Sequence, residues 1–389
     1  MSGKPRKKAE LNIAMLGQKR IPSREGGIEV VVEELATRMV AKGHHVTCYN
    51  RSGHHISGAE YESGSTREAA NKGEYKGVKL KTVWTINRRG FAAMTSSVFG
   101  AARAAAGKYD VVHIHAEGPS VMCWLPRITG KKVIVTIHGL DWQRAKWGQF
   151  ASSVIMAGER SAVRYADEII VLSRGVQQYF KDEYNRDTVF IPNGVSKPRR
   201  RKARKITERW DLERDSYVLY LGRLVPEKGV EYLIDAWRGV KTDKKLVVAG
   251  GSSDTKKYMN HLRTIAPDNV IFTGFVQGRV LEELYSNCYF YCLPSDVEGM
   301  PLTLLEAMSY GNCCLVSDIA ECTEVVEDKA PTFKKGDIVD LRKKLQELVD
   351  HPEEVKRYRE GAADFICSKY SWDDAVDKTL ALYRGEFKD

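Results

Sequence analysis

The sequence predicts an α/β protein made of two doubly wound, Rossmann-like domains, each with a parallel sheet covered by helices. Two observations support this fold class. Short runs rich in β-branched residues alternate with segments of helical spacing along the whole chain, as in successive βαβ units. The length of 389 residues also suggests two or three domains rather than one.

The first half of the chain reads as an alternating series that ends at a turn over residues 191–194. The spacing of apolar residues predicts a helix at 28–42, and further helices are expected at 95–108 and 151–165. Strands are expected at residues 11–17, 45–49, 78–83, 111–115, 133–138, 168–172 and 188–191.

A second series of the same kind follows a linker near residues 195–216. Its strands are expected at residues 217–221, 245–249, 270–273, 290–293 and 313–316. Its helices are expected at residues 230–237, 255–266, 278–286, 302–310, 337–350, 352–369 and 372–383. The chain therefore divides into two α/β units of similar size.

The net charge of +10 is concentrated in two short basic segments, residues 1–10 and 197–205. The remaining residues are neutral on balance, which argues against a protein built to bind nucleic acid. Residues 197–205 also lack interleaved aromatic side chains, so no nucleic-acid partner is predicted. A basic segment such as residues 197–205 is most often a solvated linker. The more specific alternative is that it contacts an anionic membrane surface.

The eight cysteines form no C-x-x-C pair and mostly lie in apolar segments. We therefore expect reduced, buried thiols rather than a zinc site. The apolar run at residues 11–16 is too short for a signal-peptide core, and no stretch approaches the ~18 apolar residues of a membrane span. These features predict a cytoplasmic protein that can touch the inner face of the membrane as a peripheral protein.

Residues 298–306 carry the strongest chemical signal. Glu298 follows a predicted strand and Glu306 lies in the next predicted helix, so both face the crevice where doubly wound folds bind ligands. Two ordinary surface acids would explain the pattern about equally well. The helix N-terminus offers free N–H groups suited to a phosphate, and the residues of this turn are Gly299, Met300, Pro301 and Leu302.

Arg223 and Lys228 lie in the loop after the strand predicted at residues 217–221. Two cations placed in this way can hold a diphosphate from two sides, Arg as a planar fork and Lys as a mobile charge. Two surface cations without a ligand are the alternative. The loop is neither a P-loop nor a Rossmann fingerprint, because neither glycine spacing is present.

Two loops in the first half add further candidates. The glycine pair that ends at Gly27 lets the backbone approach a ligand at a helix N-terminus, although a tight turn would need the same residues. His138 ends a predicted strand and is followed by Asp141, Trp142 and Arg144. Such a dense set of polar and aromatic groups indicates a sugar or acceptor site.

The order and spacing of these motifs agree with one family. The chain resembles family 4 glycosyltransferases of the GT-B fold, which are retaining enzymes that use nucleotide-activated sugars. The blocks at residues 20–29 and 140–148 look closest to bacterial cell-surface polysaccharide enzymes, some of them rhamnosyltransferases. The matching segments are Gly26-Gly27, His138-Gly139, residues 191–195, Gly222-Arg223, Lys228-Gly229, residues 273–276 and the Glu298/Glu306 pair.

The resemblance implies a role for each of these residues. Arg223 and Lys228 would hold the donor diphosphate, and Glu306 would accept hydrogen bonds from the nucleotide ribose. Glu298 would contact hydroxyl groups of the transferred sugar, and His138 would contact the sugar near its 6-position. The donor would then be a nucleoside-diphosphate sugar, and the acceptor a glycan or a lipid-linked glycan.

The resemblance also implies how the site is completed. Gly27 would approach the donor phosphate or the acceptor. The chain at Gly274 and Val276 would run beside the nucleobase and contact it through backbone groups. No cofactor is expected and no metal site is predicted, because no carboxylate cluster of metal-ligand type lies beside the two cations. The leaving phosphate itself would take the acceptor's proton during front-face attack. A nucleotide-sugar 2-epimerase on the same fold is the alternative.

The resemblance finally implies a domain division. The N-terminal domain would comprise residues 1–195 together with a final helix in residues 371–389 that crosses back to it. The C-terminal, nucleotide-sugar-binding domain would comprise residues 196–370. Closure of the cleft would be hinged near residues 195–216 and 370.

Overall fold

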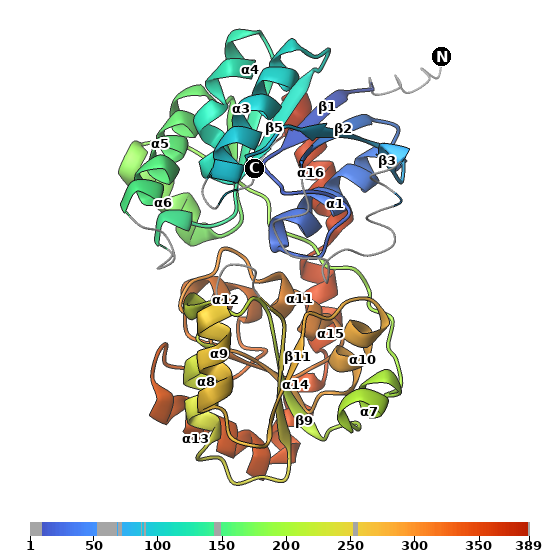
Figure 1. Ribbon diagram of the computed structural model, residues 1–389, viewed down its shortest axis with the longest axis vertical. Helices are drawn as coiled ribbons and strands as arrows, with labels where there is room; N and C mark the ends of the chain where they lie inside the picture. Colours follow the sequence, from blue (N-terminus) through green and yellow to red (C-terminus); the bar gives the residue numbers. More distant parts are fainter. Residues whose placement is uncertain are drawn as a thin grey trace, which may run out of the picture.

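The computed structural model describes residues 10–52, 68, 72–86, 88, 91–143, 149–251 and 256–387. Figure 1 shows two α/β domains stacked along the long axis, with the N-terminal domain above the C-terminal one. Each domain is built on its own sheet with helices on both faces, which confirms the predicted doubly wound fold class. No helix within the described ranges combines the length and the apolar character needed to cross a bilayer.

The N-terminal sheet has eight strands in the order β3-β4-β2-β1-β5-β6-β7-β8. All neighbours are parallel except β3 and β4, so the carboxyl ends of the central strands lie at one edge. The strand bounds are β1 (Asn12–Leu16), β2 (His45–Arg51), β3 (Glu74–Tyr75), β4 (Val78–Val83), β5 (Val111–His115), β6 (Lys132–Ile137), β7 (Glu168–Val171) and β8 (Val189–Phe190).

Helices cover both faces of this sheet. α1 places Val32, Leu35, Ala36 and Met39 in the core, the face that the helical spacing predicted. α3 and α5 cover the other face. The helix bounds are α1 (Gly27–Ala41), α3 (Phe91–Ala106), α4 (Trp124–Ile128), α5 (Gln149–Tyr165) and α6 (Arg174–Tyr184), with 3-10 turns at Gly118–Met122 and Asp141–Gln143.

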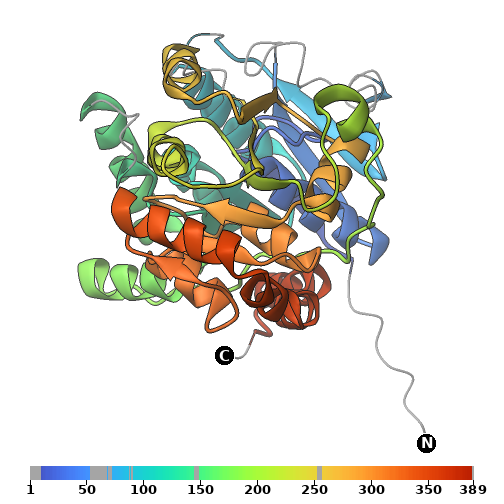
Figure 2. The same ribbon diagram turned by 90° about the horizontal axis from the view of Figure 1, so that it is seen from below.

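The C-terminal sheet has six parallel strands in the order β11-β10-β9-β12-β13-β14, with the topological switch between β9 and β12. Viewed from below, helices lie on both sides of this sheet (Figure 2). The strand bounds are β9 (Tyr217–Leu221), β10 (Lys245–Ala249), β11 (Val270–Gly274), β12 (Phe290–Leu293), β13 (Cys314–Ser317) and β14 (Thr332–Phe333).

The helices of this domain differ from the prediction in two respects. The short helices at Lys205–Trp210 and Ala320–Val326 were not predicted. Residues 352–369 form two helices instead of one, because the chain turns at Gly361, whose φ of 74° belongs to the left-handed region. The helix bounds are α7 (Lys205–Trp210), α8 (Val230–Trp237), α9 (Lys256–Ile265), α10 (Arg279–Asn287), α11 (Leu302–Ser309), α12 (Ala320–Val326), α13 (Ile338–Asp350), α14 (Pro352–Arg359), α15 (Ala362–Lys369) and α16 (Trp372–Arg384), with a 3-10 turn at Pro226–Lys228.

The chain passes between the domains twice, and the two passages lie side by side. Val195 pairs with Ser371 in a parallel bridge, and its N–H donates to the carbonyl of Tyr370 at 3.0 Å. A Cβ at Gly194 would overlap the backbone of Trp372, so only glycine permits this close approach. Beyond this point α16 packs on the N-terminal sheet beside α1 (Figure 1).

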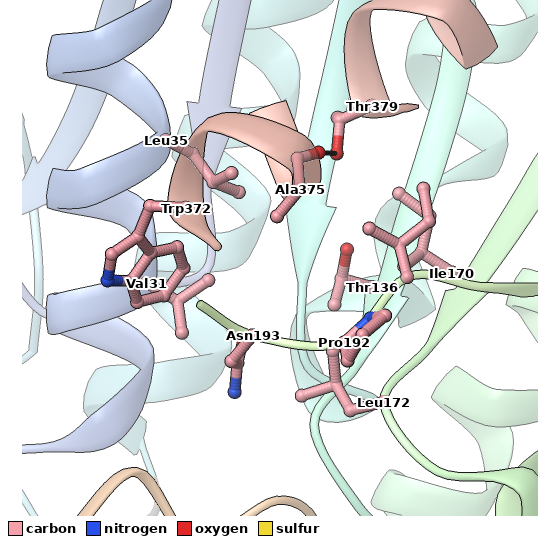
Figure 3. Close-up of a pocket in the computed structure, with 11 residues that line it drawn as sticks. Val31, Leu35, Thr136, Ile170, Leu172, Pro192, Asn193, Trp372, Ala375 and Thr379 are labelled. Carbon is pink, nitrogen blue, oxygen red and sulfur yellow. Dashed lines mark hydrogen bonds between the residues drawn. The ribbon is translucent and has the colours of Figure 1, made fainter. Parts of the chain in front are cut away.

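A small cavity lies just above these passages. Its volume is about 20 Å³, and it is enclosed by α1, α16 and the ends of β6–β8 (Figure 3). Trp372, Leu35 and Ile170 give it a mainly apolar lining. It is therefore a packing void next to the hinge, with room for at most a single water molecule.

The basic segment at residues 197–205 is more than a solvated linker. Arg201 forms an ion pair with Glu282 at 2.7 Å, and the backbone N–H of Arg204 donates to Glu283 at 3.0 Å. The last residue of the segment, Lys205, begins α7. The segment is therefore anchored to α10, which charge counting along the sequence cannot show. The other basic segment, with Lys4, Arg6, Lys7 and Lys8, lies outside the described residues.

Candidate active site

The carboxyl ends of both sheets face each other, and the predicted site residues come from the loops at these ends. Gly27 follows β1 and His138 follows β6 in the N-terminal domain. In the C-terminal domain, Arg223 and Lys228 follow β9, whereas Glu298 follows β12. Loops at the carboxyl ends of parallel strands are where doubly wound folds bind ligands. The site therefore lies between the domains.

The loop between β12 and α11 makes the contact between the domains. A Cβ at Gly299 would overlap the carbonyl oxygen of His138, and a Cβ at Gly139 would lie 2.9 Å from Cα of Gly299. The backbone N–H of Asn193 donates to Sδ of Met300 at 3.1 Å. The structure therefore shows a closed arrangement in which two backbones touch across the cleft.

Two helix N-termini also meet at this place. A Cβ at Gly27 would lie 3.6 Å from Cδ1 of Leu302, so the first turns of α1 and α11 are neighbours across the cleft. Neither helix has a side-chain cap at its N-terminus, where Gly26 and Pro301 are the preceding residues. The free N–H groups of both first turns are thus available to an anion bound between them. Pro301 precedes the helix by one residue instead of opening it.

Lys228 and Glu298 form an ion pair with 2.5 Å between Nζ and Oε1. Both side chains are largely buried, with exposed fractions of 15% and 7%. The hydroxyl of Ser295 donates to the same oxygen of Glu298 at 2.6 Å. These contacts hold Lys228, in the loop after β9, against Glu298, in the loop after β12. The two predicted site residues therefore lie in the same small region of the site.

Arg223 lies two residues beyond β9, and its backbone carbonyl accepts a hydrogen bond from the Tyr220 hydroxyl at 2.9 Å. This contact fixes the backbone of Arg223 and leaves its side chain half-buried. Among the residues that the structure describes, its guanidinium makes no ion pair. Arg223 is therefore the cation of this loop whose charge is not already balanced by a carboxylate.

Glu306 lies in α11, one turn after the helix begins. The Tyr285 hydroxyl donates to its Oε2 at 3.1 Å. Burial raises the pKa of Glu306, while the charge of Arg24 and the Tyr285 hydrogen bond act in the opposite direction. Arg24 belongs to the loop before α1, so charges of both domains act on this carboxylate.

The remaining predicted contacts lie on the C-terminal side of the cleft. Gly274 ends β11 with a φ of 70°, and a Cβ there would meet no atom within 4 Å. Val276 is half-buried and packs against the core of the same domain. The backbone between them is thus accessible to a flat ligand. Arg144, which the sequence placed in the sugar or acceptor site, lies outside the described residues.

The sequence analysis missed a row of histidines behind His138. Nδ1 of His115 lies 3.1 Å from Nε2 of His138, and the ring of His113 lies 4.1 Å from that of His115. His113 in turn contacts the Tyr383 hydroxyl at 2.6 Å and the Thr136 hydroxyl at 2.7 Å. Burial lowers the pKa of His113 to about 3 and also lowers that of His115, so both rings are neutral.

The proton of His115 can be assigned from its surroundings. Nε2 of His115 is buried and has no hydrogen-bond partner among the described residues. A buried N–H without an acceptor is costlier than a buried lone pair, so we place the proton on Nδ1. His115 then donates to Nε2 of His138 and fixes its orientation. The sequence did offer one signal for this row, because His113 and His115 are polar residues in the otherwise apolar strand at 111–115.

A second missed cluster lies behind the loop that follows His138. Glu117 and Glu159 are fully buried and hydrogen-bonded to each other. Glu117 also accepts from the Asp141 N–H at 2.8 Å, and Glu159 accepts from the hydroxyls of Tyr179 at 2.9 Å and Tyr184 at 2.5 Å. Burial and then Glu159 raise the pKa of Glu117 to about 10. Glu117 therefore keeps its proton near neutral pH, and its contact with the Asp141 N–H fixes the Asp141 loop.

The described residues contain no group of three or more His, Cys, Asp or Glu side chains placed together as metal ligands. All eight cysteines are free thiols; seven are buried and Cys367 is half-buried, as expected from the sequence.

Two family models match the chain. Residues 25–198 match the model described as Glycosyltransferase Family 4, and residues 203–365 match Glycosyl transferases group 1. Together they cover both domains and leave only the ends and a short stretch of the linker. The chain therefore belongs to the family 4 glycosyltransferases and has the GT-B fold.

Individual relatives agree with this class. The chain is 27% identical over 304 residues to an alpha-D-kanosaminyltransferase of Streptomyces kanamyceticus, covering 70% of this chain and 76% of that protein. HepE of Anabaena, solved with UDP and glucose, superposes with a TM-score of 0.78 at 15% identity over 97% of this chain and all of that one. WaaG, a glycosyltransferase involved in lipopolysaccharide biosynthesis, gives a TM-score of 0.75 at 16% identity, with coverage of 96% and 100%.

Proposed function

We propose that this glycosyltransferase moves a sugar, with retention of configuration, from a nucleoside-diphosphate sugar to an acceptor hydroxyl. The observation that carries the proposal is the meeting of two uncapped helix N-termini with a cation-bearing loop in one cleft. The N–H groups of the helix ends and the cations of the loop stabilise the negative charge that develops on a diphosphate leaving group. The bound UDP and UDP-glucose of the HepE structures are consistent with a donor of this class.

The proposed roles are those that the family resemblance implies, and the positions of the residues support them. Arg223 and Lys228 bind the diphosphate, and the first turn of α11 from Gly299 to Leu302 adds its N–H groups. Glu298 and His138, one from each domain, contact the transferred sugar. Glu306 binds the ribose of the nucleotide. Gly27 makes room for the phosphate or the acceptor, and the backbone from Gly274 to Val276 lies along the base.

Front-face attack explains how the sugar keeps its configuration. The described cleft holds no second carboxylate opposite Glu298 that is placed to act as a nucleophile. In our proposal the departing phosphate oxygen takes the proton of the acceptor hydroxyl as the new bond forms on the same face. No cofactor takes part, and turnover is independent of a metal ion because the cations and helix ends neutralise the diphosphate.

The acceptor is proposed to be a glycan or a lipid-linked glycan of cell-surface polysaccharide synthesis. The role of WaaG in lipopolysaccharide biosynthesis supports this direction. The transferred sugar can be a hexose, and rhamnose is also compatible with the site. A 6-deoxy sugar such as rhamnose would require a different contact for His138. The enzyme would act in the cytoplasm, at the inner face of the membrane.

The test is a donor-hydrolysis screen across nucleotide sugars, followed by anomeric analysis of the product by NMR. We expect one donor to be consumed, the released sugar to keep its anomeric configuration, and the rate to be unchanged in excess chelator. Arg223→Ala should lose at least about 100-fold in turnover while remaining folded. Lys329→Ala, which removes an exposed cation that pairs with the neighbouring Asp328, is the matched control. Inversion of configuration would refute the mechanism, and near-normal Arg223→Ala turnover would refute the diphosphate assignment.

The 2-epimerase alternative shares the fold and the donor class. It differs because it converts a nucleotide sugar into its epimer without any acceptor. The sheltered loop around Asp141, fixed by Glu117, favours a transferase because an epimerase needs no acceptor site. Appearance of an epimeric nucleotide sugar in the absence of acceptor would establish the alternative.

A further inference from the structure

Large exposed apolar side chains gather on one part of the N-terminal domain. Of the seven such side chains in the described chain, six lie at the end of β4, on α3 and on α4. They are Trp84 (57% exposed), Phe91 (54%), Val98 (39%), Phe99 (41%), Trp124 (37%) and Ile128 (68%), and we call them the α3–α4 surface. The seventh is Val339 in α13 of the other domain.

In helix α3 the usual arrangement of side chains is reversed: small residues face the core and large apolar residues face outward. It buries small residues, Ser96, Ser97, Gly100, Ala101, Ala104 and Ala105, against the sheet. Its exposed side carries Phe91, Val98 and Phe99 instead. A helix that serves only its own domain turns its large apolar residues to the core. The exposed aromatic rings of α3 therefore need another explanation.

These side chains come from elements that contact one another. The rings of Trp84 and Phe99 meet edge to face, with 5.3 Å between their centroids. α3 and α4 are in contact on the same side of the sheet, as Figure 1 shows, so Trp124 and Ile128 extend the region. Clustered exposed apolar groups of this size mark a binding surface more often than chance exposure.

The segments that carry this surface are rich in cations. Residues 76–109 contain seven Lys or Arg and no Asp or Glu, and residues 118–140 contain three Lys or Arg and no acid, with Asp110, Glu117 and Asp141 as the acids that adjoin them. Among the cations, Lys76, Lys79, Arg88, Arg103 and Lys108 are exposed. Arg127 is exposed too, but it pairs with Asp167 at 2.9 Å. The α3–α4 surface thus lies on segments with an excess of positive charge.

We propose that the α3–α4 surface binds an anionic lipid bilayer, with its aromatic side chains in the headgroup region. Trp and Phe beside Arg and Lys are the combination that binds membrane interfaces. A second copy of this chain would bring the same excess of positive charge to this face. Charge complementarity therefore favours anionic lipid over self-association.

The position of the surface has a consequence for the cleft. Trp84 directly follows the carboxyl end of β4, and α3 begins at Phe91, so the surface starts at the sheet edge that bears the site loops. A bilayer bound here would lie beside the rim of the cleft. The inference goes beyond the proposed transfer reaction and does not depend on it, because lipid binding is measured without any sugar donor.

The experiment is co-sedimentation of the full chain with vesicles of phosphatidylcholine containing 30% phosphatidylglycerol. We expect Phe91→Ser/Phe99→Ser to bind at least tenfold more weakly than the wild type. Val339→Ser is the control, because it removes an even more exposed apolar side chain in the other domain and should bind normally. Arg88→Gln/Lys108→Gln should weaken binding to anionic vesicles, and neutralising Lys197, Arg199 and Lys202 in the linker should not.

Thermal melting and donor hydrolysis are measured on every variant. Unchanged melting and hydrolysis with weakened vesicle binding would support the proposal and separate it from the transfer reaction. Wild-type vesicle binding by Phe91→Ser/Phe99→Ser would overturn it. So would loss of binding in the linker variant alone. A wild-type dimer in light scattering that the double variant abolishes would overturn it as well, because the surface would then join two copies.

Discussion

Lys228 and Glu298 are joined by a buried ion pair of 2.5 Å, although they lie on different loops of the C-terminal domain. Their proposed targets on the donor are different, the diphosphate for the lysine and the sugar for the glutamate. Donor binding therefore has to replace or share this pair. The pair holds both side chains in place before the donor arrives, which reduces the reorganisation needed at the moment of reaction.

Removal of either partner should affect turnover more than folding. Lys228→Ala deletes a cation at the leaving group, so kcat should fall about 10²–10³-fold. Glu298→Gln keeps the hydrogen bond from Ser295 but removes the charge, and it should also lose most activity. Steady-state kinetics with the donor found in the screen provides the measurement. Normal kcat in Lys228→Ala would refute the assignment of the lysine to the diphosphate.

Gly299→Ala should prevent the closed arrangement. The added Cβ would overlap the carbonyl oxygen of His138, so the two domains could not approach this closely. Misplacement by about 1 Å can cost ~100-fold in rate, and we expect at least that loss in kcat with an unchanged melting temperature. Small-angle scattering should show a larger radius of gyration. Gly175→Ala, whose Cβ would meet open space, is the control. Full activity in Gly299→Ala would mean that turnover does not need this contact.

His115→Phe should disturb the orientation of His138. The wild-type His115 donates to the Nε2 lone pair of His138, and Phe fills a similar space without this hydrogen bond. We therefore expect kcat to fall about tenfold with little change in donor KM. His261→Phe, at an exposed histidine of α9, is the control. Normal kcat in His115→Phe would limit His115 to a packing role.

Glu117→Gln should remove a pH dependence of stability. The pKa of Glu117 is raised from 4.5 to about 10 in the folded protein, so between these values the folded state holds a proton that the unfolded state has lost. Its contribution to the free energy of unfolding is full below pH 4.5 and declines as pH rises toward 10. Gln can keep both hydrogen bonds without titrating. Its stability advantage over the wild type should therefore grow with pH.

Urea denaturation at pH 5, 7 and 9 measures this difference. The control is Glu208→Gln, which replaces an exposed glutamate of α7. Glu117→Ala should be destabilised at every pH, because it leaves the Asp141 N–H and the Glu159 carboxylate without their partner. Parallel curves for Glu117→Gln and the wild type would show that the buried pair does not hold the extra proton.

Local patterns were sufficient to predict the fold and much of the candidate site. The strand, loop and helix around Glu298 and Glu306 follow from a short stretch of sequence, and the alternation of strands and helices predicts the parallel sheets. The Lys228–Glu298 pair could not be predicted in the same way, because the two residues are joined only by folding. His115 was overlooked because its strand reads as apolar.

The reversed arrangement of side chains in helix α3 shows a second limit of sequence patterns. Periodicity identifies residues that share one side of a helix, but it does not say which side faces the core. The expected helix at 95–108 also begins four residues after the observed start at Phe91. The break at Gly361 was missed for a related reason: a single glycine is tolerated in a helix unless the backbone there adopts a positive φ.

The packing of α16 on the first sheet has a consequence for how the protein is made. This helix is synthesised after the whole C-terminal domain, yet it covers a face of the domain that is synthesised first. The nascent N-terminal domain must therefore keep that apolar face uncovered while about 175 further residues are translated. Chaperone binding to the nascent chain should concentrate on the face that α16 later covers, and a premature stop before Trp372 should leave the N-terminal domain incomplete.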